Sequence, residues 1–487
     1  MATATPIEAK KEDAKQPAGE TLEETLLRLR KARYRQGPPT YEQRVERLDK
    51  LAEVLVRRKD EIARAIDEDF GGRSRHESLL AEVFISISHI RYVRERLHEW
   101  MEPEPREVSW LFAPGRAEIR HQPLGVVGII SPWNYPFQLG VAPLVCAIAA
   151  GNVVMVKPSE LTPKTSDLME KILAEALPAD VCAVCKGGPD VGEAFSKLAF
   201  DHLVFTGSTR VGKVVMRAAS ENLVPVTLEL GGKSPTIVAD EFKIEVAADR
   251  IMGGKLFNAG QTCIAPDYVL VPKGKVDAFV NAARAAVEKM YPTLRSNKDY
   301  TAIINQRHWD RLTSYVTECK DKGVKVVEIN PAGEELDREA HKLAPTLVIE
   351  PGDELMVMQE EIFGPILPVK SYGTLDEAMA YINEHPRLRP LALYYFGHHD
   401  EGLEKVLDHT HAGGVTINDT MLHFAQEDLP FGGIGPSGMG HYHGKEGFDQ
   451  FTKKKPVFYQ ARVNGTALMR PPYGKALDLV LRFLLGK

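Results

Sequence analysis

The stretch LGVVGIISPWN at residues 124–134 decides how this chain is expected to fold. It is a short apolar run, rich in β-branched residues, that stops at Ser, Pro and Asn, which is typical of a buried strand followed by a loop. Similar runs follow at residues 152–160, 181–188, 202–208 and 225–240, with helix-length segments such as 165–177 and 211–219 between them. Strands that alternate with helices predict βαβ units and a mostly parallel sheet.

The alternation continues in the second half of the chain. Further candidate strands lie at residues 236–240, 268–272, 324–330, 343–350 and 365–372, and a long helix is expected at about 276–290. The two series predict two α/β domains, and the change between them is expected near the glycine pair Gly231-Gly232.

The N-terminal part of the chain reads as helical. Thr40 and Gln43 have the spacing of a capping box, in which a Thr oxygen accepts from an amide and a Gln side chain reaches back. A second helical stretch is expected from about 77 to 100, with Leu80 and Val83 on its apolar face.

Composition excludes several classes of protein. The 487 residues include 44% hydrophobic and 26% charged residues, enough for large cores, and the net charge of −6 argues against a nucleic-acid partner. Five cysteines are too few for a disulfide scaffold and indicate a reducing compartment. We therefore expect a soluble, cytoplasmic protein of two or three domains.

Neither end of the chain indicates a membrane span. The first twenty residues are polar and lack the apolar core of a secretory signal, so we interpret them as a loose tail. The apolar run 476–485 is shorter than the roughly 18 residues that a span needs, and two charged residues interrupt it. It predicts a helix docked on its own protein rather than a membrane contact.

Two patterns that carry chemistry in other proteins are discounted here. Gly433, Gly435 and Gly438 match G-x-G-x-x-G in spacing, but they follow a proline and enclose another, so we expect a loop rather than a dinucleotide fingerprint. Cys182 and Cys185 form a C-x-x-C without the second pair that a structural zinc site needs. They are expected to be buried strand residues, and no metal site is predicted.

Three residues form the candidate catalytic set. Cys263 lies among Asn, Gly, Gln and Thr, a setting more typical of an approachable nucleophile than of a packed core. Glu229 ends an apolar strand, where burial would raise its pKa into the range of a general base. Asn134 follows a strand and could aim its amide at an oxyanion. Each has a structural explanation when taken alone: a packed thiol, a half-exposed strand carboxylate and an Asn turn.

Polar residues at neighbouring strand ends suggest a dinucleotide site. Lys157 and Glu160 follow one strand, and such a pair suits the hydroxyls of a ribose. Ser208 lies in a tight turn between a strand and a helix, and such a helix N-terminus could bind a pyrophosphate.

Taken together, the chain resembles the NAD(P)-dependent aldehyde dehydrogenase superfamily. Seven motifs carry the resemblance, in the family's order: SPWNYP, KPSE, FTGSTRVG, LELGGKSP, FNAGQTC, EEIFGPILPV and LPFGGIGPSGMG. Residues 424–457 are closest to the shorter, class 3-like branch, and within it the chain is most similar to bacterial members that oxidise coniferyl aldehyde. The resemblance implies a Rossmann-type parallel-sheet cofactor domain, an α/β catalytic domain and a small β oligomerisation arm.

The resemblance also assigns roles. It makes Cys263 the nucleophile and Glu229 the general base, and it places Asn134 and the Cys263 amide in the oxyanion hole. It implies NAD as cofactor, with NADP possible, held by Trp133, Lys157, Ser159, Glu160, Gly207, Ser208, Val211, Leu230, Glu361 and Phe363. The substrate is expected to be a small aldehyde, such as coniferyl or a related aromatic aldehyde, contacted by Tyr135, His423 and Phe424.

The domain boundaries expected from this comparison complete the prediction. They are a tail at 1–20, an NAD-binding domain at 21–108 and 123–231, a catalytic domain at 232–440, an arm at 109–122 and 451–462 that pairs subunits into a homodimer, and a C-terminal extension at 463–487. Four alternatives stay open: a broad-specificity medium-chain, long-chain or simple aromatic aldehyde dehydrogenase, a coenzyme-A-acylating relative, a non-catalytic scaffold of the same fold, and a cysteine hydrolase.

Overall fold

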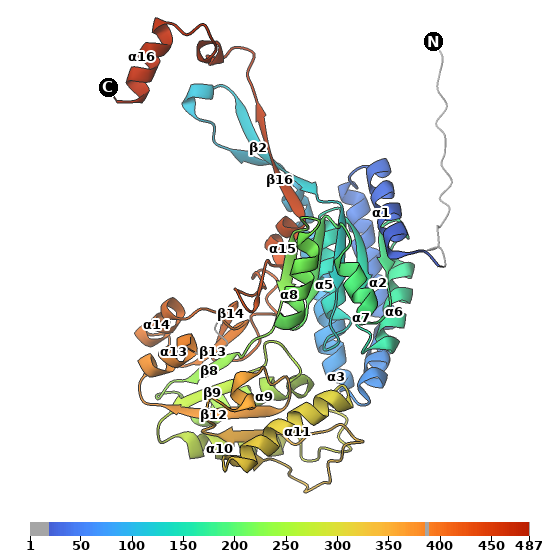
Figure 1. Ribbon diagram of the computed structural model, residues 1–487, viewed down its shortest axis with the longest axis vertical. Helices are drawn as coiled ribbons and strands as arrows, with labels where there is room; N and C mark the ends of the chain where they lie inside the picture. Colours follow the sequence, from blue (N-terminus) through green and yellow to red (C-terminus); the bar gives the residue numbers. More distant parts are fainter. Residues whose placement is uncertain (1–18, 385–388, 487) are drawn as a thin grey trace.

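The computed structural model of the protein describes residues 19–384 and 389–486. Within these residues the strands form three sheets, of six, seven and three strands. Figure 1 shows the two larger sheets in separate halves of the molecule, with the three-stranded sheet projecting as an arm. The tail predicted at the N-terminus lies outside the described residues up to residue 18.

The six-stranded sheet is built from the apolar runs that open the sequence argument. In spatial order its strands are β15 (Gly438–Met439), β7 (Val226–Glu229), β6 (His202–Thr206), β3 (Val126–Ile130), β4 (Val153–Lys157) and β5 (Cys182–Val184). All its neighbours pair in parallel except β15 with β7. Every residue of β3, β4 and β6 is buried, as in a parallel sheet covered on both faces. The predicted parallel sheet is confirmed.

Helices cover this sheet on both faces (Figure 1). They are α1 (Leu22–Gln36), α2 (Tyr41–Phe70), α5 (Gln138–Ala149), α6 (Pro163–Ala176), α7 (Pro189–Ser196) and α8 (Thr209–Ser220). The predicted capping box of α2 is present: the Thr40 hydroxyl accepts from the Gln43 amide at 3.3 Å, and Gln43 Oε1 accepts from the Thr40 amide at 2.9 Å.

The second predicted helical stretch is interrupted by a wider turn. It consists of α3 (Arg75–Ser78), a π-helical segment η1 (Leu79–Phe84) and α4 (Ile85–Met101). A π turn holds more residues than an α turn, so it rotates the apolar face. Val83 is buried as expected, but Leu80 is 56% exposed. The prediction that Leu80 belongs to the core is therefore wrong.

The seven-stranded sheet occupies the other half of the molecule. Its strands, in spatial order, are β10 (Lys325–Glu328), β11 (Thr346–Ile349), β12 (Ile366–Tyr372), β9 (Tyr268–Pro272), β8 (Pro235–Val238), β13 (Ala392–Phe396) and β14 (Gly414–Ile417). Its helices are α9 (Ile244–Leu256), α10 (Val276–Met290), α11 (Gln306–Asp321), α12 (Met356–Gln359), α13 (Leu375–Glu384) and α14 (Glu401–His409). The chain passes from one sheet to the other between β7 and β8, where the sequence places Gly231-Gly232.

The three-stranded sheet forms the projecting arm. β2 (Arg116–Pro123) pairs antiparallel with β1 (Glu104–Arg106) on one side and with β16 (Thr452–Tyr459) on the other. Helix α15 (Gly444–Gln450) leads into β16. Part of the stretch predicted to form the arm, residues 110–112, is a 3-10 turn, η2 (Trp110–Phe112).

The C-terminal helix corrects one expectation. After the 3-10 turn η4 (Thr466–Met469), α16 (Lys475–Leu484) contains no buried residue, and Leu479 and Phe483 are 70% and 78% exposed. Figure 1 shows it beyond the tip of the arm. The prediction that it docks on its own protein is therefore wrong, although the Phe483 ring lies 6.4 Å from the Trp110 ring of the arm. No described helix is long and apolar enough to cross a membrane.

Candidate active site

Cys263 follows a loop held in an unusual backbone conformation. The 3-10 segment η3 (Phe257–Gly260) contains Asn258 and Ala259 at φ values of 52° and 51°, and Gly260 at 76°. A side chain at position 260 would lie 2.4 Å from the carbonyl oxygen of Gly364, so glycine is required there. Strained backbone persists only where the surroundings fix it, and such strain is concentrated at functional sites.

The Gln261 side chain fixes this loop from inside. Its Nε2 donates to the carbonyl oxygens of Asn258 and Ala302, both at 3.0 Å, and its Oε1 accepts from the Ile304 amide at 2.9 Å. The polar residues before Cys263 therefore hold the loop, and the thiol is left partly exposed.

Cys263 opens onto an apolar cavity of about 520 Å³. The cavity lies between η1, α5, α9 and the loop after β14, and its lining includes Leu80, Phe84, Tyr135, Phe424 and Phe431. Two of the three predicted substrate residues, Tyr135 and Phe424, are thus in place. His423 is not among the lining residues: its ring stacks on Phe431 and its Nδ1 contacts the Thr416 hydroxyl, so its substrate role stays a prediction.

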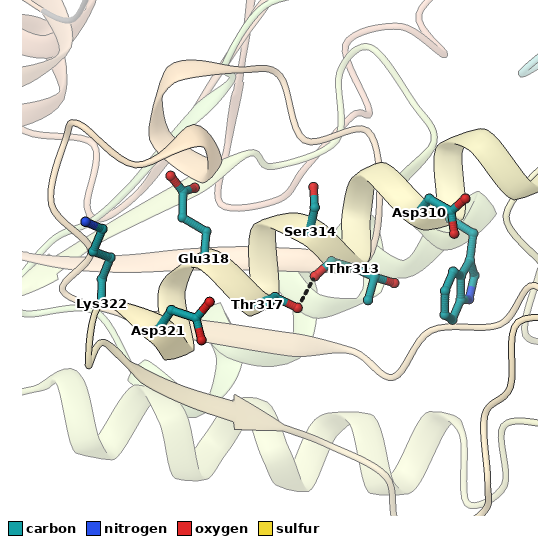
Figure 2. A pocket seen from close by; sticks show the side chains of 8 residues that line it. Asp310, Thr313, Ser314, Thr317, Glu318, Asp321 and Lys322 are labelled. Carbon is teal, nitrogen blue, oxygen red and sulfur yellow. Dashed lines mark hydrogen bonds between the residues drawn. The ribbon is translucent and has the colours of Figure 1, made fainter.

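A second cavity, of about 550 Å³, has no cysteine nucleophile among the described residues that line it. It runs along α11, and Figure 2 shows its side chains spread along one face of that helix. The dashed bond in the view is local, from the Thr317 hydroxyl to the Thr313 carbonyl oxygen at 3.0 Å. The cavity at Cys263 is the better candidate because it holds a nucleophile.

Glu229 is a buried carboxylate without a partner. It is the last residue of β7, in register with Thr206 on one side and Gly438 on the other. It is 2% exposed, and neither carboxylate oxygen has a hydrogen-bond partner in the described structure. Burial raises the pKa of Glu229 well above its ordinary value. A raised pKa makes a carboxylate a stronger base, which suits a general base.

Burial, more than the nearby charge, keeps the Cys263 thiol protonated. Burial raises the pKa of Cys263, and the negative charges of Glu361 and Glu229 raise it further. In their ionised forms, the Glu361 and Glu229 carboxylates therefore disfavour the thiolate.

Asn134 joins the strand end to the nucleophile loop. Its Nδ2 donates to the Gln261 carbonyl oxygen at 3.1 Å, and its own carbonyl oxygen accepts from Asn258 Nδ2 at 3.1 Å. A side-chain amide carries two N–H groups, so one remains for a ligand. Asn134 is 3% exposed, which restricts its motion.

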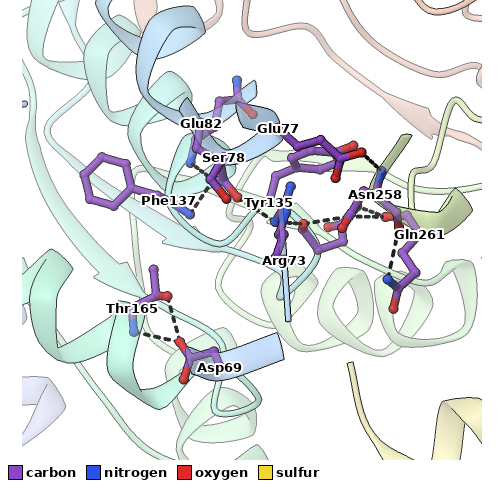
Figure 3. A network of polar contacts seen from close by, with 12 residues as sticks. Asp69, Arg73, Glu77, Ser78, Glu82, Tyr135, Phe137, Thr165, Asn258 and Gln261 are labelled. Carbon is purple, nitrogen blue, oxygen red and sulfur yellow. Dashed lines mark hydrogen bonds and ion pairs between the residues drawn. The ribbon is translucent and has the colours of Figure 1, made fainter. Parts of the chain in front are cut away.

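The buried ion pair of Arg73 and Glu82 bonds the backbone of Asn134. This pair was not predicted from the sequence. Arg73 Nη1 donates to the Asn134 carbonyl oxygen at 2.8 Å and to Glu82 Oε1 at 2.9 Å. The other oxygen of Glu82 accepts from the amides of Phe137 and Gln138, at 3.0 and 2.9 Å. Figure 3 shows this network between η1 and the loop before α5. Its one sequence signal is the acidic Glu82 inside an apolar helical stretch.

Glu77 extends the same network to the loop before Cys263. Its Oε1 accepts from the Asn258 amide at 3.1 Å, and its Oε2 accepts from the Thr301 hydroxyl at 2.7 Å. The backbone bend at Asn258 is thus bonded to α3, and Figure 3 shows this contact as well.

The predicted dinucleotide residues lie at the carboxyl ends of β4 and β6. Lys157 ends β4, and its Nζ is 2.7 Å from Glu160 Oε2; Ser159 is buried between them. Ser208 caps α8, and its hydroxyl accepts from the Val211 amide at 3.4 Å. Gly207 precedes it. Ligands bind at this edge of parallel sheets, and a helix N-terminus favours a phosphate.

The remaining predicted cofactor residues lie in the segment after β7 and around Glu361 and Trp133. A Cβ at Gly231 would lie 2.1 Å from Glu361 Oε2, so glycine lets this carboxylate approach the backbone after β7. Glu361 Oε1 is buried and unpaired, and burial raises the pKa of Glu361 to about 8. Phe363 packs edge-on against Trp133, with ring centroids 5.4 Å apart. The Leu230 amide donates to the Ser437 carbonyl oxygen at 3.0 Å.

The cysteine pair lies at a buried strand, and the glycine-rich stretch lies in a loop. Cys182 and Cys185 are buried in and next to β5, and burial raises the pKa of both to about 12. Gly433 and Gly435 lie in a loop before β15. Among the described residues no cluster of His, Cys, Asp or Glu has the arrangement of a metal site.

Comparison with known proteins gives consistent matches over most of the chain. A model described as the aldehyde dehydrogenase family matches residues 29–457. A "Probable coniferyl aldehyde dehydrogenase" of Caulobacter vibrioides is 51% identical over 96% of each chain. A "Coniferyl aldehyde dehydrogenase" of a Pseudomonas species is 48% identical over 96% of this chain and 98% of its own. An NAD⁺ complex of an aldehyde dehydrogenase from Bacillus cereus superposes with a TM-score of 0.80 at 27% identity, over 90% of this chain and 88% of its own.

Proposed function

The chain belongs to the aldehyde dehydrogenase family, and from this premise we propose that it oxidises coniferyl aldehyde or a related aromatic aldehyde to the acid, with NAD as hydride acceptor. The observation that carries the proposal is the Cys263 thiol at an apolar cavity, together with the buried, unpaired Glu229 carboxylate whose charge raises the pKa of that thiol.

Cys263 is proposed to form the covalent intermediate. An aldehyde has no leaving group, so its oxidation requires the loss of hydride. Attack of the thiolate on the carbonyl carbon gives a tetrahedral adduct with a negative oxygen. The free N–H of Asn134 and the Cys263 amide would donate to that oxygen. NAD supplies the hydride acceptor, and the product on Cys263 is a thioester.

Glu229 is proposed to complete the cycle. A water molecule must attack the thioester, and an ionised Glu229 can take its proton as the acid and the thiolate form. The carboxylate suits this role because no other group of the described structure bonds it. Its presence favours hydrolysis over transfer of the acyl group to coenzyme A.

The cofactor residues fit NAD. The unpaired Glu361 Oε1 offers an acceptor for ribose hydroxyls beside the Cys263 cavity. Glu160, at the carboxyl end of β4, is partly accessible and paired with Lys157, which suits the two hydroxyls of an adenine ribose. The Glu160 carboxylate would repel a 2′-phosphate, so NAD is expected to bind more tightly than NADP.

The cavity supports an aromatic substrate. Its volume of about 520 Å³ falls within the range of roughly 300–1,000 Å³ typical of small-molecule sites. The rings of Tyr135, Phe424 and Phe431 line it. Contacts between these rings and an aromatic substrate would stabilise the bound substrate in addition to the burial of its apolar surface. The two bacterial relatives named for coniferyl aldehyde agree with a phenolic aldehyde.

The experiment is a panel of substrates with the purified protein. NADH absorbance is followed with coniferyl aldehyde, benzaldehyde and a medium-chain aldehyde, with NAD and with NADP. The proposal expects the highest kcat/KM for coniferyl aldehyde with NAD. A medium-chain aldehyde preferred over both aromatic compounds would contradict the substrate class, and absence of NADH with every aldehyde would contradict the activity.

The arm is proposed to pair two copies of the chain in the cytoplasm. Outward residues of β16 are exposed, including Phe458 at 49%, and exposed strand edges favour pairing with another chain. The catalytic thiol requires reduced surroundings, which the cytoplasm supplies. Light scattering during size-exclusion chromatography would give twice the monomer mass, whereas the monomer mass would contradict the pairing.

A further inference from the structure

Three arginines surround a polar cavity on the edge of the six-stranded sheet opposite the active site. We call this the arginine pocket: Arg33 and Arg47 line a cavity of about 300 Å³, and Arg44 lies directly behind it. The walls come from the end of α1, the start of α2 and the residues that begin β4. Val153 starts β4 and Lys157 ends it, so about 13 Å of strand, at ~3.3 Å per residue, separates this pocket from the predicted cofactor residues.

Arg44 is fixed in place by backbone carbonyls. It is 4% exposed, its Nε donates to the Pro39 carbonyl oxygen at 3.1 Å, and its Nη1 donates to the Ala149 carbonyl oxygen at 2.8 Å. Its Nη2 lies against Gly151, where a Cβ would come within 2.7 Å, and Gly151 itself lines the pocket at a φ of 91°. The guanidinium is thus rigid, and its partners carry no negative charge.

The arginines lack carboxylate partners at close range. None of the three belongs to an ion pair within 4.0 Å among the described residues, and the buried Nε of Arg33 has no hydrogen-bond partner. Two acidic groups, Asp180 and Glu46, raise the pKa of Arg47 through their charge, without forming an ion pair with it. Asp180 is already bonded to Gln36 Nε2 at 2.5 Å.

Because no carboxylate of the described residues pairs with them, the three guanidinium groups repel one another. Burial, together with the charges of Arg33 and Arg47, lowers the pKa of Arg44 to about 10. Burial also lowers the pKa of Arg33 and of Arg47. A guanidinium stays protonated at neutral pH, so the unfavourable charge is relieved by an anion rather than by loss of a proton.

We propose that the arginine pocket binds a phosphate group, either as free phosphate or as the phosphate of a small monoester. Guanidinium groups present planar sets of donors that match phosphate oxygens, and two or more of them favour a dianion over a singly charged carboxylate. The cavity is too small for a dinucleotide but holds a phosphate with a short substituent. The site is independent of aldehyde oxidation, because no residue of the pocket belongs to the proposed active site.

Titration calorimetry on the full chain tests this site. Inorganic phosphate and glycerol 3-phosphate are the probes, and sodium chloride of equal ionic strength is the reference. Saturating NAD is included so that phosphate does not bind at the Ser208 turn. The variants are Arg33→Gln, Arg47→Gln and the double variant, and Arg284→Gln on α10 is the control for an equal loss of charge at an exposed position.

Wild type and Arg284→Gln are expected to bind phosphate alike, each single variant about tenfold more weakly, and the double variant not measurably. Without phosphate, the variants should melt at the same temperature as wild type or higher, because like charges have been removed. Tighter binding of glycerol 3-phosphate identifies an ester as the ligand, and equal binding identifies free phosphate. Unchanged phosphate binding in the double variant, or no binding by wild type, would overturn the proposal. NADH formation, which depends on other residues, stays at the wild-type rate in either case.

Discussion

The Asn134 side chain donates to the backbone carbonyl oxygen of Gln261 at 3.1 Å, which ties the predicted oxyanion donor to the loop that carries Cys263. One residue follows a strand of the six-stranded sheet, and the other precedes a strand of the seven-stranded sheet. The bond therefore spans the two halves of the molecule, and the relative position of donor and nucleophile is set before a substrate arrives.

Replacement of Asn134 by alanine tests the donor. The loss of one oxyanion donor typically lowers kcat about 10²–10³-fold. KM for the aldehyde should change little, because the interaction forms mainly in the transition state. The matched control is Asn222→Ala, which removes an exposed amide that donates to the Lys197 carbonyl oxygen at 2.9 Å. A kcat equal to that of the control would exclude Asn134 from the reaction.

Variants of the Arg73–Glu82 pair distinguish its effect on the stability of the fold from its effect on catalysis. Both side chains are 0% exposed, so Arg73→Met leaves a buried carboxylate and should lower the free energy of unfolding by about 3–5 kcal/mol. Arg73→Met combined with Glu82→Gln removes the unpaired charge and should regain part of that stability. It should not regain kcat, because the Asn134 carbonyl oxygen still lacks the Arg73 donor and keeps only the bond from Asn258 Nδ2.

Denaturant unfolding and steady-state kinetics of the same three proteins give the comparison. Arg75→Met, which breaks an exposed pair with Asp60, is the control and should change both quantities little. If kcat returned together with stability in the double variant, the pair would have a purely structural role.

Glu229 should make the stability of the fold depend on pH. Its pKa is raised in the folded chain, so above about pH 4.5 the unfolded chain ionises this residue while the folded chain keeps it protonated. The stability that protonated Glu229 contributes is therefore fully present below that pH. It is lost as the pH rises toward the pKa of Glu229 in the folded chain. Glu229→Gln does not titrate, so its melting temperature should exceed that of wild type by more at about pH 8 than at about pH 5. An equal difference at both values would mean that the carboxylate is ionised in the folded chain.

Much of the fold could be predicted because the strands are fully buried. A strand such as Val126–Ile130 carries apolar side chains on both faces, and this leaves a clear run in the sequence. The expected helix at 276–290 coincides with α10. The π turn at η1 and the undocked α16 could not be predicted in this way, since periodicity shows which side chains are apolar but not what covers them.

The candidate site was predicted unevenly for a similar reason. Cys263, Glu229 and Asn134 lie in motifs or at strand ends, which single them out in the sequence. Arg73 supports Asn134 from 61 positions away, and that contact exists only in the folded chain. His423 and Phe424 are adjacent, and the same contact with the substrate is predicted for both from the sequence. In the fold, the His423 ring stacks on Phe431, whereas Phe424 lines the cavity.

Phe424 is expected to select for aromatic aldehydes. Phe424→Ala removes a ring from the cavity wall, and KM for coniferyl aldehyde should rise about tenfold. KM for acetaldehyde, which is too small to reach the ring, should stay within twofold. Leu429→Ala, on the same loop but outside the cavity lining, is the control. Equal increases for both aldehydes would indicate general damage to the loop rather than selection.

The thioester on Cys263 is the central claim, and mass-spectrometric peptide mapping of Glu229→Gln tests it most directly. Without the base, this variant should release about one NADH per site and then stop, with the acyl group of coniferyl aldehyde held on Cys263. The double variant with Cys263→Ser should form neither NADH nor adduct. An NADH burst with Cys263 unmodified, or with the acyl group on another cysteine, would contradict the account.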